Sequence, residues 1–408
     1  MYGAPPKGGT FVGTSATGSA HRLSRMASFA KYSTQAGDRW MVRYRKPTGK
    51  STEKRGFKTK RDATTWAAAT LIDKNSGNFI SESARRKKVG ELITEHLART
   101  AAVKPSTAAN RGFHASKWTM PKWQGWAVGD IGNADVQAWV QDMSDGGAGS
   151  ATIEKAVGIL RGALSIAVTA RLVPANAARQ LALPRARKRK NIYLTHGDVF
   201  ELAAAVRPES RSLVLFLAYT GLRFGEAAAL TIGDLDLPRR RVNVRASVTE
   251  VLGVMEGGPT KSNRDRSVPM PGFIAELVSS QAAGRLKSEL VFAGRSGGPI
   301  RLNNWRPRTF NVAVATVNAA RVDAANGMPV EPFPKVTPHD LRHAAASLAI
   351  HAGANVKSVQ RMLGHASAAM TLDIYADLFE DDLDGVADAL GKAAEGWVAS
   401  VSPASKRL

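Results

Sequence analysis

Cysteine is absent from all 408 residues of the chain. Disulfide bonds, thiolate nucleophiles and cysteine-based zinc sites are therefore excluded. Long apolar runs are lacking too, because the longest one, near residues 213–222, is interrupted by Tyr219 and Thr220 and is too short to span a bilayer. The Gly-, Ser- and Thr-rich start of the chain has no apolar core of the kind that a signal peptide carries. We therefore expect a cytoplasmic protein without a membrane partner.

Acidic residues are also scarce, since 34 Asp and Glu stand against 57 Lys and Arg and leave a formal net charge of +23. This charge favours a polyanionic partner, and nucleic acid fits best because neutralised phosphates release condensed counterions. The apolar share of 44% and the charged share of 22% are typical of a folded globular protein. A chain of this length predicts two or three domains.

The N-terminal part predicts a disordered tail over 1–30 and a small basic domain over 31–80. Apolar and basic residues alternate in Arg39–Arg45, which predicts a half-buried strand, and 51–57 predicts a returning strand. A capping box over Thr59–Asp62 then opens a helix.

Positive charge is concentrated in this part of the chain. Residues 31–88 hold 16 Lys and Arg against five Asp and Glu, which is almost half of the net charge. A solvated sheet face would explain the charge, but its concentration on so small a domain favours contact with DNA. The side chains expected to make that contact are Arg39, Arg43, Arg45, Lys54, Arg55 and Lys58.

The segment 89–183 predicts a helical domain from the spacing of its apolar residues. The expected helices lie near residues 89–97, 136–143 and 153–168. Trp118, Trp123 and Trp126 are expected to pack in its core, since large aromatic side chains are more often packed than functional.

Two basic segments, Arg85–Lys88 and Pro184–Lys190, are interpreted as linkers around this domain. The second is either a solvated tether or a strap that lies on the DNA backbone. Its candidate DNA contacts are Arg187, Lys188, Arg189 and Lys190. A final domain over 192–395, mostly helical with a strand-rich insert near 241–268, precedes a tail over 396–408.

The residues with the clearest chemistry lie near the C-terminal end. Thr337–His343 reads Thr-Pro-His-Asp-Leu-Arg-His, Leu363–His365 reads Leu-Gly-His, and Tyr375 follows ten residues later. A phenol can attack phosphorus while arginine and histidine hold the charge that develops on phosphate oxygens. On a helix, His339 and Arg342 would project from one face near its N-terminus.

His339 and His343 also have the spacing of a metal-binding pair. A zinc peptidase would need glutamate at position 340 as its base, and the chain has Asp340. The basic charge argues against this alternative as well. We therefore interpret His343 as a residue that supports the site or packs in the core.

Five boxes in order make residues 192–390 resemble the catalytic domain of the tyrosine recombinases, the phage integrase family. The matching positions are Arg223 in Thr-Gly-Leu-Arg-Phe-Gly-Glu, Lys261 in Thr-Lys-Ser-Asn-Arg-Asp-Arg, His339, Arg342, His365 and Tyr375. The expected fold class is mainly α with small β-sheets in a multidomain chain. Its parts are a small three-stranded sheet plus helix resembling an arm-type DNA-binding domain, a helical core-binding domain and a mixed α/β catalytic domain.

The resemblance implies a site-specific recombinase that cuts and rejoins DNA through a 3′-phosphotyrosine on Tyr375. Arg223 and Arg342 would clamp the phosphate, and Lys261 would protonate the leaving 5′ oxygen. His339 and His365 would donate hydrogen bonds or shuttle protons, and Glu226 would orient the site. Neither a cofactor nor a metal is expected. A type IB topoisomerase-like enzyme and a non-catalytic DNA-binding regulator are the alternatives.

The resemblance also implies partners. Double-stranded DNA attachment sites come first, bound by four copies of the chain. An excisionase and a host DNA-bending protein are expected in addition, and the setting would be a phage or another mobile element in a bacterial host.

Overall fold

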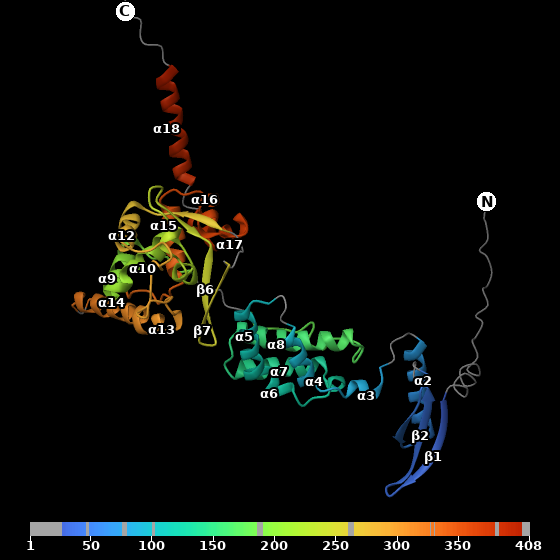
Figure 1. The fold of residues 1–408 in the computed structure, drawn as a ribbon. Coiled ribbons are helices and arrows are strands. Elements are labelled where there is room, and N and C mark those ends of the chain that lie inside the picture. Colours follow the sequence, from blue (N-terminus) through green and yellow to red (C-terminus); the bar gives the residue numbers. More distant parts are fainter. Residues whose placement is uncertain are drawn as a thin grey trace, which may run out of the picture. The chain divides into compact units, whose positions relative to one another are not determined.

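The structure is a computed structural model, and it describes residues 27–45, 49–75, 80–99, 103–185, 191–259, 265–326, 328–329, 331–379 and 383–401. The chain divides into two compact units, residues 1–186 and residues 187–408 (Figure 1). Lys261, the basic residues 187–190 and residues 1–26 of the expected tail lie outside the described residues. None of the described helices combines the length and the apolar character that crossing a bilayer needs.

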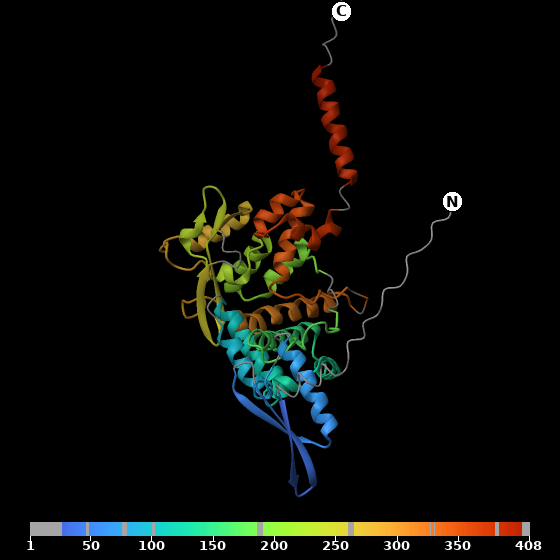
Figure 2. The ribbon, with the colours of Figure 1, turned by 90° about the vertical axis from the view of Figure 1, so that its right-hand side faces the viewer.

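The first unit begins with the predicted antiparallel sheet. Its strands pair in the order β1 (Ala27–Thr34), β2 (Gly37–Arg45), β3 (Ser51–Phe57), and α2 (Lys60–Asn75) packs on one face (Figures 1 and 2). Val42, Ala63 and Ala67 form the buried contact between sheet and helix. The strand and helix predictions for this domain are confirmed.

Local hydrogen bonds explain where α2 starts, and cross-strand pairing explains where β1 starts. The Thr59 hydroxyl accepts from the Asp62 amide at 3.1 Å and the Asp62 carboxylate accepts from the Thr59 amide at 3.2 Å, as the capping box predicts. The expected tail over 1–30 is wrong at its end, because residues 27–30 are already in β1. Phe29 pairs there with the buried Val42, so tertiary packing extends the sheet beyond what the local sequence indicates.

The remainder of the first unit is helical. Its elements are α3 (Glu82–Arg85), α4 (Val89–Ala98), α5 (Pro105–His114), η1 (Ala115–Thr119), α6 (Met120–Trp123), η2 (Val128–Asp130), α7 (Asn133–Asp145) and α8 (Ser150–Thr169). The three expected helices correspond to α4, α7 and α8, and their apolar residues form one core. The Arg85–Lys88 linker prediction is wrong in part, since α3 ends at Arg85 and Lys88 forms a β-bridge with Ala127.

The three tryptophans of this unit differ in burial. Trp123 is fully buried, Trp118 packs against the core, and Trp126 is 36% exposed. The expectation of three core residues is therefore wrong for Trp126, whose ring lies edge-on to Trp123 at the surface of the core.

The second unit contains the residues of interest for catalysis. Its helices are α9 (His196–Ala205), α10 (Pro208–Thr220), α11 (Phe224–Ala228), α12 (Gly272–Ala282), α13 (Leu302–Trp305), α14 (Asn311–Ala324), α15 (Asp340–His351), α16 (Val356–Leu363), α17 (Ala368–Tyr375) and α18 (Leu383–Val401), with the short turns η3 (Ile232–Asp234), η4 (Arg306–Phe310) and η5 (Ala376–Leu378). The apolar run that includes Leu213 and Phe216 forms the buried centre of α10, against which α9, α12 and α15 pack.

The strand-rich insert is confirmed as two small antiparallel sheets. One has the order β4 (Leu235–Asp236), β5 (Arg241–Val244), β8 (Arg266–Pro269), and the other pairs β6 (Ala246–Val251) with β7 (Val254–Pro259). Val242 lies opposite Val268 with both side chains in the main core, which fixes the register. At the C-terminal end, α18 runs through the domain boundary expected after residue 395.

Candidate active site

Arg223 lies immediately before α11, where the chain leaves α10. Gly221 ends α10 in the left-handed region with φ 66°, and a Cβ there would meet a Leu363 side-chain carbon at 2.8 Å. This turn presents Arg223 with its side chain partly exposed. Its guanidinium donates to Glu226 Oε1 at 2.9 Å, and its backbone amide donates to Glu226 Oε2 at 2.9 Å. Arg223 is the extended N-cap residue of α11 and Glu226 lies in the first turn, so the two side chains meet across the start of the helix.

Arg266, at the start of β8, was not identified from the sequence. Its guanidinium donates to both oxygens of Glu226, at 3.0 and 2.6 Å, and its Nε donates to the Met362 carbonyl at 3.2 Å. Burial alone would raise the pKa of Glu226, but the hydrogen bonds and charge of Arg266, with those of Arg223, lower it below its usual value. Glu226 therefore stays ionised and holds two arginines.

Arg342, on the first turn of α15, is buried and is 4% exposed. Its two terminal nitrogens donate to the Gly221 carbonyl at 2.6 Å and the Leu363 carbonyl at 2.5 Å. Burial and the neighbouring charge of Arg223 lower its pKa to about 9, so Arg342 remains charged near neutral pH. These bonds join the ends of α10 and α16 at one guanidinium.

His365 follows the end of α16. Gly364 adopts φ 68°, and a Cβ there would meet the Arg266 side chain at 2.9 Å, so glycine allows the turn to lie against that arginine. The His365 Nδ1 lies 3.0 Å from the hydroxyl of the buried Thr371. Burial and the charges of Arg342 and Arg223 lower the pKa of His365 to about 4. His365 is therefore neutral at neutral pH, and a Thr371 hydroxyl that donates to Nδ1 leaves Nε2 with the proton.

Tyr375 ends α17 and is 1% exposed. Its hydroxyl lies 2.9 Å from Nδ1 of His343. Burial raises the pKa of Tyr375 above its usual value, and the positive charge of Arg342 opposes this effect. The adjacent Ile374 carbonyl accepts from Asn191 at 2.8 Å and from the Tyr193 hydroxyl at 3.2 Å, which anchors the end of α17.

The start of α15 positions the two histidines of the Thr337–His343 box. The Asp340 carboxylate accepts from the Thr337 amide at 2.6 Å and from its hydroxyl at 2.8 Å, which fixes the first turn. His339 directly precedes the helix, as predicted, and its ring is edge-on to His343 with 5.2 Å between centroids. In the described part of the chain, no group of three or more His, Asp or Glu side chains could hold a metal ion.

The structure thus gathers most predicted residues from separate segments. The charge of Arg342 interacts with Arg223, Glu226, Arg266 and Tyr375, and that of His365 with His343. Sequence reasoning missed Arg266, Thr371 and the bond of His343 to the phenol. Arg266 could have been identified from its place in the same motif as Lys261. Thr371 and the His343–Tyr375 contact leave no pattern in the sequence, because each depends on a partner that comes close only in the folded chain.

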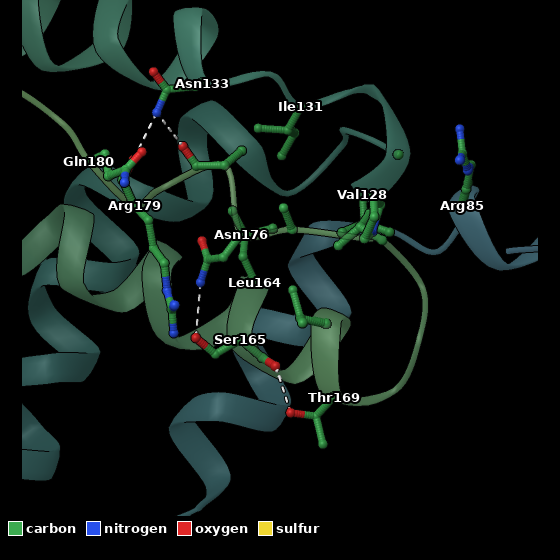
Figure 3. Close-up of a pocket in the computed structure, with 16 residues that line it drawn as sticks. Arg85, Val128, Ile131, Asn133, Leu164, Ser165, Thr169, Asn176, Arg179 and Gln180 are labelled. Atoms are coloured by element: carbon green, nitrogen blue, oxygen red, sulfur yellow. Dashed lines mark hydrogen bonds between the residues drawn. The ribbon is translucent and has the colours of Figure 1, made fainter. Parts of the chain in front are cut away.

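A cavity with a volume of about 950 Å³ lies in the first unit, apart from these residues, and is lined in part by Asn133, Ser165, Asn176 and Arg179 (Figure 3). Asn133 donates to the carbonyls of Ala177 and Arg179 at 3.0 and 2.8 Å across one of its walls.

The basic residues of the N-terminal sheet lie on two faces. Lys54 pairs with Val42 on the face that α2 covers and forms an ion pair with Glu82 at 2.6 Å. Arg39, Arg43 and Arg45 alternate with the residues that face the helix, so they share the opposite face. Arg55 also lies on this outer face. Both Arg55 and Arg43 form ion pairs there with Glu53. Lys58 is exposed just before α2.

A solved structure of the Tn1549 transposon integrase in complex with transposon right end DNA matches the chain with a TM-score of 0.63. The match covers 74% of this chain and 100% of that chain at 21% identity, and it concerns the fold.

Sequence comparison finds similar proteins as well. Residues 193–381 match the model of the phage integrase family. The transposase of transposon Tn916 from Enterococcus faecalis is 26% identical over 324 residues, covering 75% of this chain and 78% of that protein. Tyrosine recombinase XerC of Mycobacterium tuberculosis is 27% identical over 251 residues, covering 58% of this chain and 76% of XerC. Residues 193–381, which carry the site, therefore match the phage integrase family, and the chain is similar to a transposase and to a tyrosine recombinase.

Proposed function

We propose that the chain cuts and rejoins double-stranded DNA with Tyr375 as the nucleophile. The observation that carries the proposal is the convergence of Arg223, Arg342, His365 and Tyr375, which come from four segments of the chain and interact through their charges. A guanidinium provides planar, permanently charged donors for two phosphate oxygens. Two arginines and a neutral histidine therefore form a donor set for the charge that builds up during attack.

In the first step, the Tyr375 oxygen attacks the scissile phosphorus. An O–P bond to the phenol forms, the bond from phosphorus to the 5′ oxygen breaks, and a 3′-phosphotyrosine and a 5′ hydroxyl result. The phenol gives its proton to a base, and Lys261 supplies a proton to the 5′ oxygen. The 5′ hydroxyl of the partner strand then attacks the phosphotyrosine and releases Tyr375. One phosphodiester replaces another, so the reaction consumes no nucleotide cofactor.

Assembly and location follow from the same proposal. Four copies would hold two DNA duplexes at attachment sites, and an excisionase and a host DNA-bending protein would set the direction of exchange. The outer face of the N-terminal sheet would bind DNA outside the crossover region, with residues 187–190 on the backbone between the units. The solved Tn1549 integrase is bound to transposon DNA, which supports this choice of substrate. The protein would act in the cytoplasm of a bacterial host.

The test is trapping of covalent DNA. The protein is incubated with a pool of random-sequence duplexes, the reaction is stopped with detergent, and DNA joined to protein is recovered and sequenced. The selected sequence is then built into a duplex with a nick a few nucleotides to the 3′ side of the cleavage position, so that the short fragment with the new 5′ hydroxyl diffuses away and the adduct accumulates. We expect an adduct that maps to Tyr375 and is absent from Tyr375→Phe. Equal adduct from both proteins would refute the proposal, and strand exchange between two duplexes distinguishes recombination from topoisomerase-like resealing.

A further inference from the structure

The nucleophile lies next to a histidine that the sequence pattern assigned no chemical step. The hydroxyl of Tyr375 and Nδ1 of His343 are 2.9 Å apart, and their ring centroids are 5.7 Å apart. The two residues come from α17 and α15, so the contact is tertiary and brings a nitrogen to the reacting oxygen. A general base must lie within about 2.6–3.2 Å of the proton that it removes.

The surroundings of His343 keep its ring neutral at neutral pH. Burial lowers the pKa of His343 below its usual value, and the adjacent charges of His339 and Arg342 act in the same direction. Asp340 opposes them. A neutral imidazole has one nitrogen with a free lone pair, which is what a proton acceptor needs.

The same surroundings provide for the protonated state. Asp340 is held by Thr337 through two hydrogen bonds, so its carboxylate stays beside His343 at a fixed place. From α17, Tyr375 faces His343, and the charge of His343 also interacts with that of His365. An imidazolium formed during attack would gain from Asp340 and from the phosphate that carries the new negative charge.

We propose that His343 is the catalytic residue that accepts the phenolic proton of Tyr375. As the O–P bond forms, the O–H bond of Tyr375 breaks and its proton moves to Nδ1. In rejoining, the steps reverse: the incoming 5′ hydroxyl forms the new phosphodiester, and His343 returns the proton to the departing Tyr375 oxygen. The inference deepens the proposed function and rests on it.

The test measures single-turnover adduct formation on the nicked duplex from about pH 5 to about pH 9, with wild type, His343→Gln and His343→Ala. His351→Gln is the matched control, because His351 lies two turns further along α15 and contacts the Ser347 carbonyl at 2.7 Å. Melting temperatures of all four proteins establish that they are folded.

We expect the wild-type rate to fall on the acid side, where His343 takes up a proton. His343→Gln should react on the order of 10²- to 10⁴-fold more slowly, with a rate that rises with hydroxide concentration in place of the acid limb. Imidazole in the buffer should restore part of the rate to His343→Ala, and His351→Gln should match wild type. A structural role alone would produce neither the changed pH profile nor the rescue.

Three results would overturn the inference while leaving the proposed function intact. They are an unchanged rate in folded His343→Gln, a loss that is the same at every pH without imidazole rescue, and a wild-type rate that is flat across the acid range. The last needs no variant, so it decides the matter if the substitutions prevent folding. Absence of any adduct in wild type would instead refute the proposed function.

Discussion

Arg266 donates hydrogen bonds to both carboxylate oxygens of Glu226, and the Arg223 guanidinium donates to one of the same oxygens. The side chain of Glu226 is fully buried and that of Arg266 is 8% exposed. One carboxylate therefore orders two arginines, of which only Arg223 is partly open to solvent. Since Arg266 also holds the Met362 carbonyl, it connects the strand after the Lys261 segment to the turn that carries His365.

Replacing Arg266 with methionine should slow adduct formation by on the order of 10²-fold, since misplacement of a reacting group by about 1 Å has that effect. The variant leaves a buried carboxylate with Arg223 as its partner, which should also lower the free energy of unfolding by about 3–5 kcal/mol. Single-turnover rates well below the melting temperature separate the two effects.

The control for this variant is Arg321→Met. Arg321 forms ion pairs with Asp198 and Glu201 in the same unit, away from the charge cluster. It should lower the melting temperature without changing the rate of the folded protein. An equal rate loss in both variants would show that Arg266 contributes to stability and not to positioning.

Thr371 should matter through the tautomer of His365. Thr371→Val keeps the volume of the buried side chain but removes the hydroxyl 3.0 Å from Nδ1, so the ring is free to carry its proton on the wrong nitrogen. We expect adduct formation to slow by about 10- to 100-fold, less than the loss of a whole oxyanion donor. Thr371→Ser retains the hydroxyl and should stay close to wild type. Because the pKa of His365 is about 4, the defect should persist across neutral pH; a defect that disappears there would contradict this role.

Lys261 can be tested by changing the leaving group. Lys261→Ala should lose on the order of 10²- to 10⁴-fold in rate on ordinary DNA, because the 5′ oxygen then departs without a proton. A duplex with sulfur in place of that bridging oxygen should restore the rate, since a thiolate with a pKa near 8.5 leaves unaided. Tyr375→Phe should stay inactive on both duplexes. An equal loss on the two substrates would assign Lys261 to phosphate contact alone.

Short sequence patterns predicted the helices and strands that depend on interactions between residues close together in the chain. The cap at Thr59 and the alternation around Val42 are short-range features, and both are confirmed. The helix α5 was missed because its small and polar residues give little apolar spacing to detect.

A sequence motif could propose a site residue, but it could not propose a contact between distant segments. Arg223, Arg342 and Tyr375 were each proposed from a motif, whereas the Arg266–Glu226 pair spans 40 positions and the His343–Tyr375 contact spans 32. Such pairs depend on how β8, α11, α15 and α17 pack, which periodicity does not specify. The position of Lys54 also could not be predicted. Lys54 is basic like its neighbours in the sequence, but its pairing with Val42 places it on the face that α2 covers.

The two faces of the N-terminal sheet should differ in how much they contribute to DNA binding. If the outer face binds the phosphate backbone, Arg39→Gln and Arg45→Gln should each weaken DNA binding and reduce the slope of log affinity against log salt by about 1. Lys54→Gln removes the same charge from the helix-covered face, where Lys54 is paired with Glu82, and should leave the slope unchanged. Binding titrations at several salt concentrations on one duplex give all four slopes, wild type included. A slope that falls equally for Lys54→Gln would mean that overall charge attracts the DNA, whichever face of the sheet carries it.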